Sequence, residues 1–276
     1  MDEQQRYAAL AAPSHRHAMP RTNVDQHGRD DLGRKGHTPG LPDIPDEIRP
    51  QAAVTLAWVR FGRVRMHLCG GWYAVPAVAA EELFAGFGFS EAEWMDAEVG
   101  GPAWNEIVHG SSREDHRYCS RAFVVPEVQG WALVFGRTGH DVVVAERTAE
   151  LSGRFGTAYW YGVNCSDGWA AWCIAEAGEV IRHYDYDNPL VMVGAPHPAE
   201  AGLRLPHEPS GLPDEAMDTL DITDAEALAT GYQRLLAEYG VPEVCDTQTV
   251  AGRTSVDPEE IEITGPTAIV RTSCRQ

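Results

Sequence analysis

The clearest pattern of hydrophobic and polar positions lies between residues 122 and 187. Five short runs rich in β-branched and aromatic residues are separated by turn-forming residues, which is typical of strands. The runs cover residues 122–125, 131–135, 157–165, 169–176 and 179–186. Because the connections between the last three runs are too short for a crossover, the pattern predicts a hairpin followed by a three-stranded antiparallel meander.

Two other segments repeat their core-facing residues every three or four positions, as amphipathic helices do. The first follows Asp141 and ends at Gly156, and its inner face holds Val144, Thr148, Leu151 and Phe155. The second begins with a capping box of Thr223 and Glu226 and ends at Gly240. Its apolar stripe consists of Leu228, Tyr232, Leu235 and Tyr239.

The region before residue 122 gives weaker signals. Residues 54–68, interrupted by Gly62, predict a pair of strands or one bent strand. Two helices are also expected, one from Pro76 to Gly88 and a short one that opens with Ser90 and Glu93 and carries Trp94. Residues 96–120 show no regular pattern, so we expect irregular structure there.

These elements together predict an α+β fold in which amphipathic helices cover an antiparallel β-meander sheet. We expect residues 51–276 to form one such domain, with a sub-boundary near residue 120. Residues 1–50 contain few large apolar residues and end in a series of prolines. Such a segment cannot bury enough apolar area to offset the entropy of ordering it, so the sequence predicts a disordered N-terminal tail.

Aromatic residues occur on both faces of the predicted meander. Because successive side chains of a strand point to opposite faces, Trp160 points away from Tyr159 and Tyr161, and Trp169 points away from Trp172. Either both faces are covered, or one is covered and the other is a binding surface for a partner. All five aromatic residues are therefore candidates for binding.

The charge of the chain narrows the class of partner. The formal net charge is -19, from 41 acidic and 22 basic residues. Fifteen of the acidic residues lie between positions 200 and 262, where Arg204, Arg234 and Arg253 are the only basic residues other than histidine. A negative field of this kind repels phosphate backbones and anionic lipid headgroups. We therefore expect a basic protein partner, and neither nucleic acid nor a membrane.

Other features of the sequence favour a cytoplasmic protein. The first residues are acidic and no apolar leader segment follows them. No apolar run approaches the ~18 residues that a membrane span requires. The six cysteines are scattered and contain no Cys-x-x-Cys pair, so free thiols are expected. No cofactor-binding motif is present, so no cofactor is expected.

Residues 250–258 resemble the turn of a helix-turn-helix motif. A second helix would begin at Asp257 and Pro258 and would present Glu259, Glu260 and Glu262. A DNA-reading helix needs Arg or Lys at such positions. The segment therefore predicts two short helices with a structural role, the second one capped by Asp257.

Three groups of residues are candidates for chemistry. Cys165 would be a nucleophile if His183, on the neighbouring hairpin, activated it. Asp185, with Asp187 and Asn188, ends a strand and offers carboxylates for acid–base work or for holding a cation. His109, His116 and Cys119 carry ligand types that suit zinc, but a second ligand pair at zinc-site spacing is missing. No metal site is therefore expected.

About half of the chain resembles a loose group of uncharacterised actinobacterial proteins. The resemblance is carried by residues 130–134, by Leu151-Ser152-Gly153-Arg154-Phe155-Gly156, by the hairpin 172–184, and by Val250-Ala251-Gly252 with Ser255-Val256-Asp257-Pro258. These motifs are structural in character. The resemblance implies a shared fold and supplies no catalytic residue and no activity.

Two hypotheses about function follow. The first is a non-enzymatic, acidic protein-binding module, of the kind exemplified by toxin-neutralising immunity proteins or by a regulatory protein. The second is an accessory or tailoring enzyme with its site near the 165–187 meander. The acidic charge, the aromatic sheet and the lack of a specific catalytic motif favour the first hypothesis.

Overall fold

The computed structural model describes residues 58–62, 64–68, 70–109, 121–136, 143–164, 168–188, 192–221 and 223–272. The predicted disordered tail, residues 1–50, lies outside the described residues. Within them, helices and strands are mixed as the α+β prediction requires. None of the described helices is long and apolar enough to cross a membrane.

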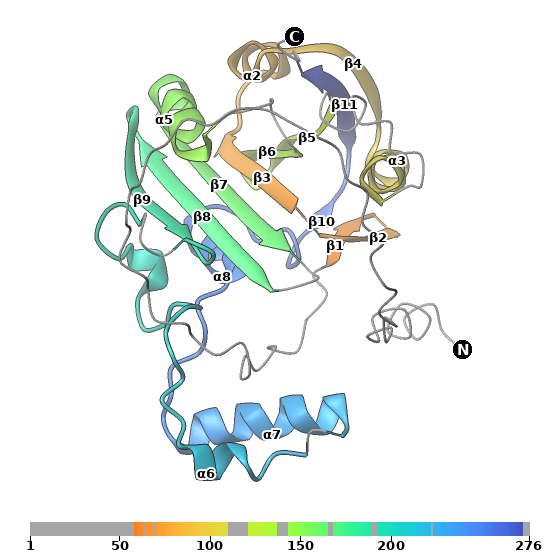
Figure 1. Cartoon of the computed structure of the whole chain (residues 1–276). Coiled ribbons are helices and arrows are strands. Elements are labelled where there is room, and N and C mark those ends of the chain that lie inside the picture. Colours follow the sequence, from red (N-terminus) through yellow and green to blue (C-terminus); the bar gives the residue numbers. More distant parts are fainter. Residues whose placement is uncertain are drawn as a thin grey trace, which may run out of the picture. The chain divides into compact units, whose positions relative to one another are not determined.

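An eight-stranded sheet in which every neighbouring pair is antiparallel forms the centre of the described chain (Figure 1). Its strand order is β4-β11-β5-β6-β3-β7-β8-β9. The strands are β3 (Gly70–Pro76), β4 (Phe89–Asp96), β5 (Arg121–Val128), β6 (Trp131–Phe135), β7 (Thr157–Asn164), β8 (Trp169–Glu176), β9 (Glu179–Asp185) and β11 (Pro266–Thr272). The predicted hairpin corresponds to β5–β6 and the predicted meander to β7–β8–β9, so both predictions are confirmed.

The β8–β9 turn shows why the sequence folds this way locally. Ala177 and Gly178 both have positive φ, of 49° and 92°. Two such residues in succession suit a two-residue hairpin whose twist matches that of the strands. Trp172 of β8 pairs in register with Tyr161 of β7 and with Tyr184 of β9. One row of aromatic residues therefore crosses three strands.

A second, three-stranded sheet has the order β10-β1-β2. It consists of β1 (Trp58–Phe61), β2 (Val64–His67) and β10 (Glu262–Ile263). The first two strands are antiparallel and are joined at Gly62, whose φ is +54°. The prediction of a strand pair before Leu68 is therefore confirmed.

One face of the large sheet is covered by two helices, α2 (Ala80–Phe87) and α5 (Val144–Phe155). Leu83 and Phe87 of α2 and Leu151 of α5 pack with sheet residues such as Tyr73 and Val75 in one buried cluster. α5 contacts β7, β8 and β9 (Figure 1). The helix predicted after Asp141 is confirmed, with Thr148 and Leu151 buried and Gly156 at its end.

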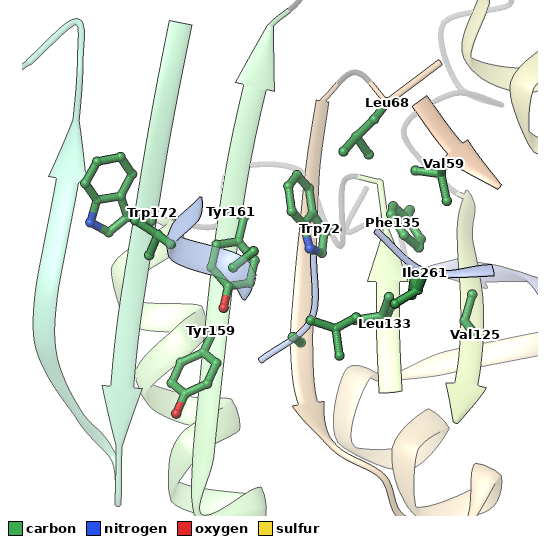
Figure 2. Close-up of a cluster of buried hydrophobic side chains, with 14 of the residues drawn as sticks. Val59, Leu68, Trp72, Val125, Leu133, Phe135, Tyr159, Tyr161, Trp172 and Ile261 are labelled. Carbon is green, nitrogen blue, oxygen red and sulfur yellow. The ribbon is translucent and has the colours of Figure 1, made fainter. Parts of the chain in front are cut away.

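The opposite face holds a larger buried cluster (Figure 2). Residues of α3 (Ala97–His109), α8 (Thr247–Thr254) and the 3-10 helix η2 (Pro198–Glu200) join it, together with the small sheet. Val250 and Ala251 of α8 are completely buried there. Trp104 of α3 stacks on Phe123 with a distance of 6.2 Å between ring centroids. Both faces of the sheet are therefore covered by helices or by the small sheet.

The helix predicted from Pro76 to Gly88 is present as α2 and ends at Gly88, but it begins only at Ala80 because Pro76 belongs to strand β3. Two other predictions in the first half of the chain are wrong. The segment around Ser90 and Trp94 is strand β4 because it pairs along its length with β11. Residues 97–109 form helix α3, in spite of its internal glycines and Pro102. Gly100 is needed because a Cβ there would overlap Thr267 of β11, so α3 can approach the sheet closely only with glycine.

Residues 211–241 form what we call the acidic hairpin, which contains α6 (Asp214–Met217) and α7 (Ala225–Glu238). The helix predicted in this region is confirmed, but its N-cap is Asp224 and not Thr223. The Asp224 side chain accepts a hydrogen bond from the backbone N–H of Ala227 at 2.8 Å. The Thr223 hydroxyl instead donates to Asp221 at 2.6 Å.

The chain on the two sides of the acidic hairpin is joined by backbone hydrogen bonds. The N–H of Arg204 donates to the carbonyl of Glu243 at 2.9 Å, and the N–H of Cys245 donates to the carbonyl of Arg204 at 2.8 Å. The His207 ring also lies against Tyr184 of β9, with 3.2 Å between Nδ1 and the phenol oxygen. These contacts form the root of the hairpin.

Candidate functional site

Three of the five candidate aromatic residues belong to the buried core. Tyr161 and Trp172 are completely buried and Tyr159 is 8% exposed. Figure 2 shows them on the same face as Trp72. The Tyr161 hydroxyl lies 2.6 Å from the Thr254 hydroxyl and 2.8 Å from the Ser255 hydroxyl. Burial raises the pKa of the Tyr161 phenol far above its usual range. The Tyr161 side chain thus ties the end of α8 to the sheet.

Trp160 and Trp169 lie on the other face, which α2 and α5 cover. Both are only partly buried. Their rings meet edge to face, with centroids 6.1 Å apart. The prediction that Trp160 and Trp169 point away from Tyr161 and Trp172 is therefore confirmed by the geometry.

Of the catalytic candidates, the structure describes His183 and Asp185, whereas Cys165 lies outside the described residues. His183 and Asp185 are two positions apart on β9, so their side chains share the face that holds Trp160 and Trp169. Burial lowers the pKa of His183, against a smaller opposing effect of the Asp185 carboxylate. Its imidazole is therefore neutral at neutral pH.

The cysteines of the described chain do not suit nucleophilic chemistry. Cys173 and Cys245 are both completely buried. Burial raises the pKa of each thiol to about 12. Because the thiolate is the reactive form, these two residues are packing residues.

The metal candidates lie in a region that the structure does not describe. His116 and Cys119 are outside the described residues, as is the side chain of His109. Among the described residues, no three His, Cys, Asp or Glu side chains come together as a metal site would require.

A buried ion pair lies next to the hairpin root and is not among the sequence-based predictions. Arg182 of β9 and Glu200 of η2 are 3% and 5% exposed, and the Arg182 Nε donates to the Glu200 Oε1 at 2.6 Å. The Trp172 Nε1 donates to the same oxygen at 2.8 Å. Arg182 lies on the same strand face as the buried Tyr184. An arginine at a core-facing position is the sequence feature that indicates a buried ion pair here.

The acidic hairpin carries many exposed charged side chains, nearly all of them negative. It has seven carboxylates and one basic residue, Arg234. The carboxylates are Asp214, Glu215, Asp218, Asp221, Asp224, Glu226 and Glu238, and all are exposed. An open cavity of about 560 Å³ lies between the α6–α7 connection and α7, and its lining includes Asp221, Asp224, Glu226 and Arg234.

The hairpin also has a small apolar interior and an exposed aromatic residue. Ala216, Leu235 and Leu236 are buried. Gly231 allows Leu220 to approach α7, since a Cβ at this position would lie 2.9 Å from the Leu220 side chain. Tyr239, at the end of α7, is 54% exposed. Tyrosine is enriched at protein–protein interfaces.

The resemblance to a helix-turn-helix motif does not extend to the geometry. Helix α8 is present, but the predicted second helix is a turn at residues 258–260 that leads into β10. Asp257 stabilises this turn by accepting a hydrogen bond from the backbone N–H of Glu259 at 2.9 Å. The prediction of a second helix is therefore wrong.

Asp257 gives a testable dependence of stability on pH. Burial raises its pKa to about 6; the backbone hydrogen bond from Glu259 opposes this to a smaller extent, and the carboxylates of Glu259, Glu260 and Asp246 add still smaller increases. The folded state therefore holds the Asp257 proton more tightly than the unfolded state does. This stabilisation is complete below about pH 4 and is lost as the pH rises through about 6.

We expect Asp257→Asn to stabilise the protein at about pH 8, where the carboxylate would be charged, by on the order of 1 kcal/mol after screening by solvent. At about pH 4 the variant should match the wild type. Urea unfolding at both pH values measures the difference, with the exposed Asp218→Asn as control. A stability difference that is the same at both pH values would contradict the assignment.

Comparisons with known proteins identify no relative: no family model matches the chain, and no curated protein or solved structure matches it significantly. The resemblance to actinobacterial proteins stays a prediction.

Proposed function

We propose that this protein is a non-enzymatic binding module that captures a basic protein partner through the acidic hairpin, as an immunity or regulatory protein does. The observation that carries the proposal is the concentration of seven exposed carboxylates and one arginine in residues 211–241. Complementary charge speeds the encounter with a basic partner and disfavours acidic ones.

Two further features support a protein as the partner. The cavity on the hairpin is open, whereas sites for small substrates are usually enclosed and mostly apolar. Tyr239 and the half-buried Tyr232 add aromatic surface next to the carboxylates. The mixture of aromatic and acidic side chains suits an interface that excludes water at its centre and attracts charge at its rim.

Neutralising three carboxylates of the hairpin should weaken capture of the partner. Glu215→Gln, Asp218→Asn and Glu226→Gln remove charge and leave the N-cap Asp224 intact. We expect the affinity for the captured basic protein to fall by about tenfold or more, mainly through slower association. The partner is first captured from a lysate of the source cells at low ionic strength and then purified for titration.

The matched control is Glu82→Gln, Glu93→Gln and Glu179→Gln, which changes the net charge equally at exposed positions of α2, β4 and β9. This variant should lose no more than about twofold in affinity. The proposal is wrong if no basic protein is retained, or if the two triple variants weaken binding equally.

A further inference from the structure

A row of small residues crosses the face of the sheet that α2 and α5 cover. In register, Gly71 of β3 faces Gly162 of β7, Gly162 faces Ala171 of β8, and Ala171 faces Asp185 of β9. Residues paired in register across neighbouring strands share one face of the sheet. The row therefore contains no large side chain of its own and ends in a carboxylate.

The indole rings of Trp160 and Trp169 lie over this row. A Cβ added to Gly162 would be 2.6 Å from the Trp160 ring and 2.5 Å from the Trp169 ring. A Cβ on Gly71 would be 2.9 Å from the Trp160 Nε1. The two glycines thus let both rings rest directly on the backbone of the sheet, and each ring remains partly exposed.

Asp185 is held in place beside this pair of rings. Its Oδ1 accepts a hydrogen bond from the Trp169 Nε1 at 2.9 Å and another from the backbone N–H of Asp187 at 3.0 Å. In the described part of the chain, its Oδ2 accepts none. His183, two residues earlier on the same face, is neutral at neutral pH, so it adds no positive charge beside Asp185.

We propose that Trp160, Trp169 and Asp185 form a binding site for a guanidinium group, which an arginine side chain of the basic partner presents. A guanidinium plane stacks on the faces of indole rings and donates hydrogen bonds to a carboxylate at its edge. The net charge of -19 favours a cationic group over a neutral or anionic one. The identity of the group that carries the arginine, a basic protein partner, rests on the proposed function; the guanidinium site itself does not.

The site is tested with small probes that need no knowledge of the partner. The indole N–H signals of the ¹⁵N-labelled full chain are followed by NMR during titration with N-acetyl-arginine amide, N-acetyl-lysine amide and N-acetyl-citrulline amide. Citrulline amide has nearly the shape of arginine amide but lacks its charge. With arginine amide, we expect the Trp160 and Trp169 signals to shift and to saturate at a concentration on the order of 1 mM. The other two probes should bind more weakly.

Variants separate direct contact from the general negative field. Asp185→Asn should reduce the affinity for arginine amide by about fivefold or more, whereas the neighbouring exposed Asp187→Asn should change it by less than about twofold. The Trp160→Phe variant lacks the Trp160 indole N–H and therefore assigns that NMR signal. It also keeps an aromatic ring at position 160, so it remains usable if substitution by a smaller residue prevents folding.

Equal affinity for the three probes, or an absence of shifts at Trp160 and Trp169, would overturn the inference. If these signals do not move while the hairpin variant still loses its partner, the guanidinium site is wrong and the proposed function stands.

Discussion

Replacing Glu200 with alanine will lower the free energy of unfolding by about 3–5 kcal/mol, because it leaves the buried Arg182 guanidinium without its counter-charge. Arg182 is 3% exposed, and its remaining partners would be the carbonyl of Gly194 at 3.3 Å and the sulfur of Met192 at 3.9 Å. The Trp172 indole N–H would lose its acceptor as well. Equilibrium unfolding in urea measures the loss.

The Arg147–Glu150 pair provides a matched control. Its N–O distance is also 2.6 Å, but the Glu150 side chain is 68% exposed. Glu150→Ala should therefore cost less than about 1 kcal/mol. A double variant, Arg182→Met with Glu200→Leu, should recover part of the loss because neither charge remains in the core. Similar costs for Glu200→Ala and Glu150→Ala would contradict the role given to burial.

Removing the acidic hairpin should leave the rest of the protein folded. If a short Gly/Ser linker replaces residues 211–241, the Arg204–Glu243 and Cys245–Arg204 hydrogen bonds of the root remain. The Tyr184–His207 contact also remains. α6 and α7 pack only slightly against the other described helices and strands. Shortening a loop changes its closure entropy little, so we expect the free energy of unfolding to change by about 1 kcal/mol or less.

Elements that depend on local signals could be predicted from the sequence. Strands β7 to β9 are separated by short turns, and α5 and α7 have regular stripes with stop signals. Each of these segments carries its own pattern of period two or period 3.6. The meander and the two helices were therefore predicted close to their observed bounds, and the α+β class followed from them.

Elements that depend on distant partners could not be predicted. Ser90 and Glu93 fit a helix start, but pairing with β11, far along the chain, makes the segment a strand. Helix α3 contains residues that disfavour helices, and its close approach to Thr267 is what requires Gly100. In both cases tertiary contacts override local propensity.

The candidate site shows the same division. Alternation along the strands placed Trp160 and Trp169 on one face and Tyr161 and Trp172 on the other. The register that aligns Gly71, Gly162 and Asp185 joins residues from three strands, and no single segment contains it. The Arg182–Glu200 pair likewise joins a strand to a loop whose path the sequence does not reveal.

The affinity of the partner for the hairpin-deleted protein tests the central claim most directly. The variant that lacks residues 211–241 is first shown to unfold cooperatively, and its binding to the captured basic protein is then titrated at low and at physiological ionic strength. We predict that affinity falls by at least about 100-fold and that little salt dependence remains. A folded variant that binds the partner as tightly as the intact chain, with the same salt dependence, would contradict the proposal.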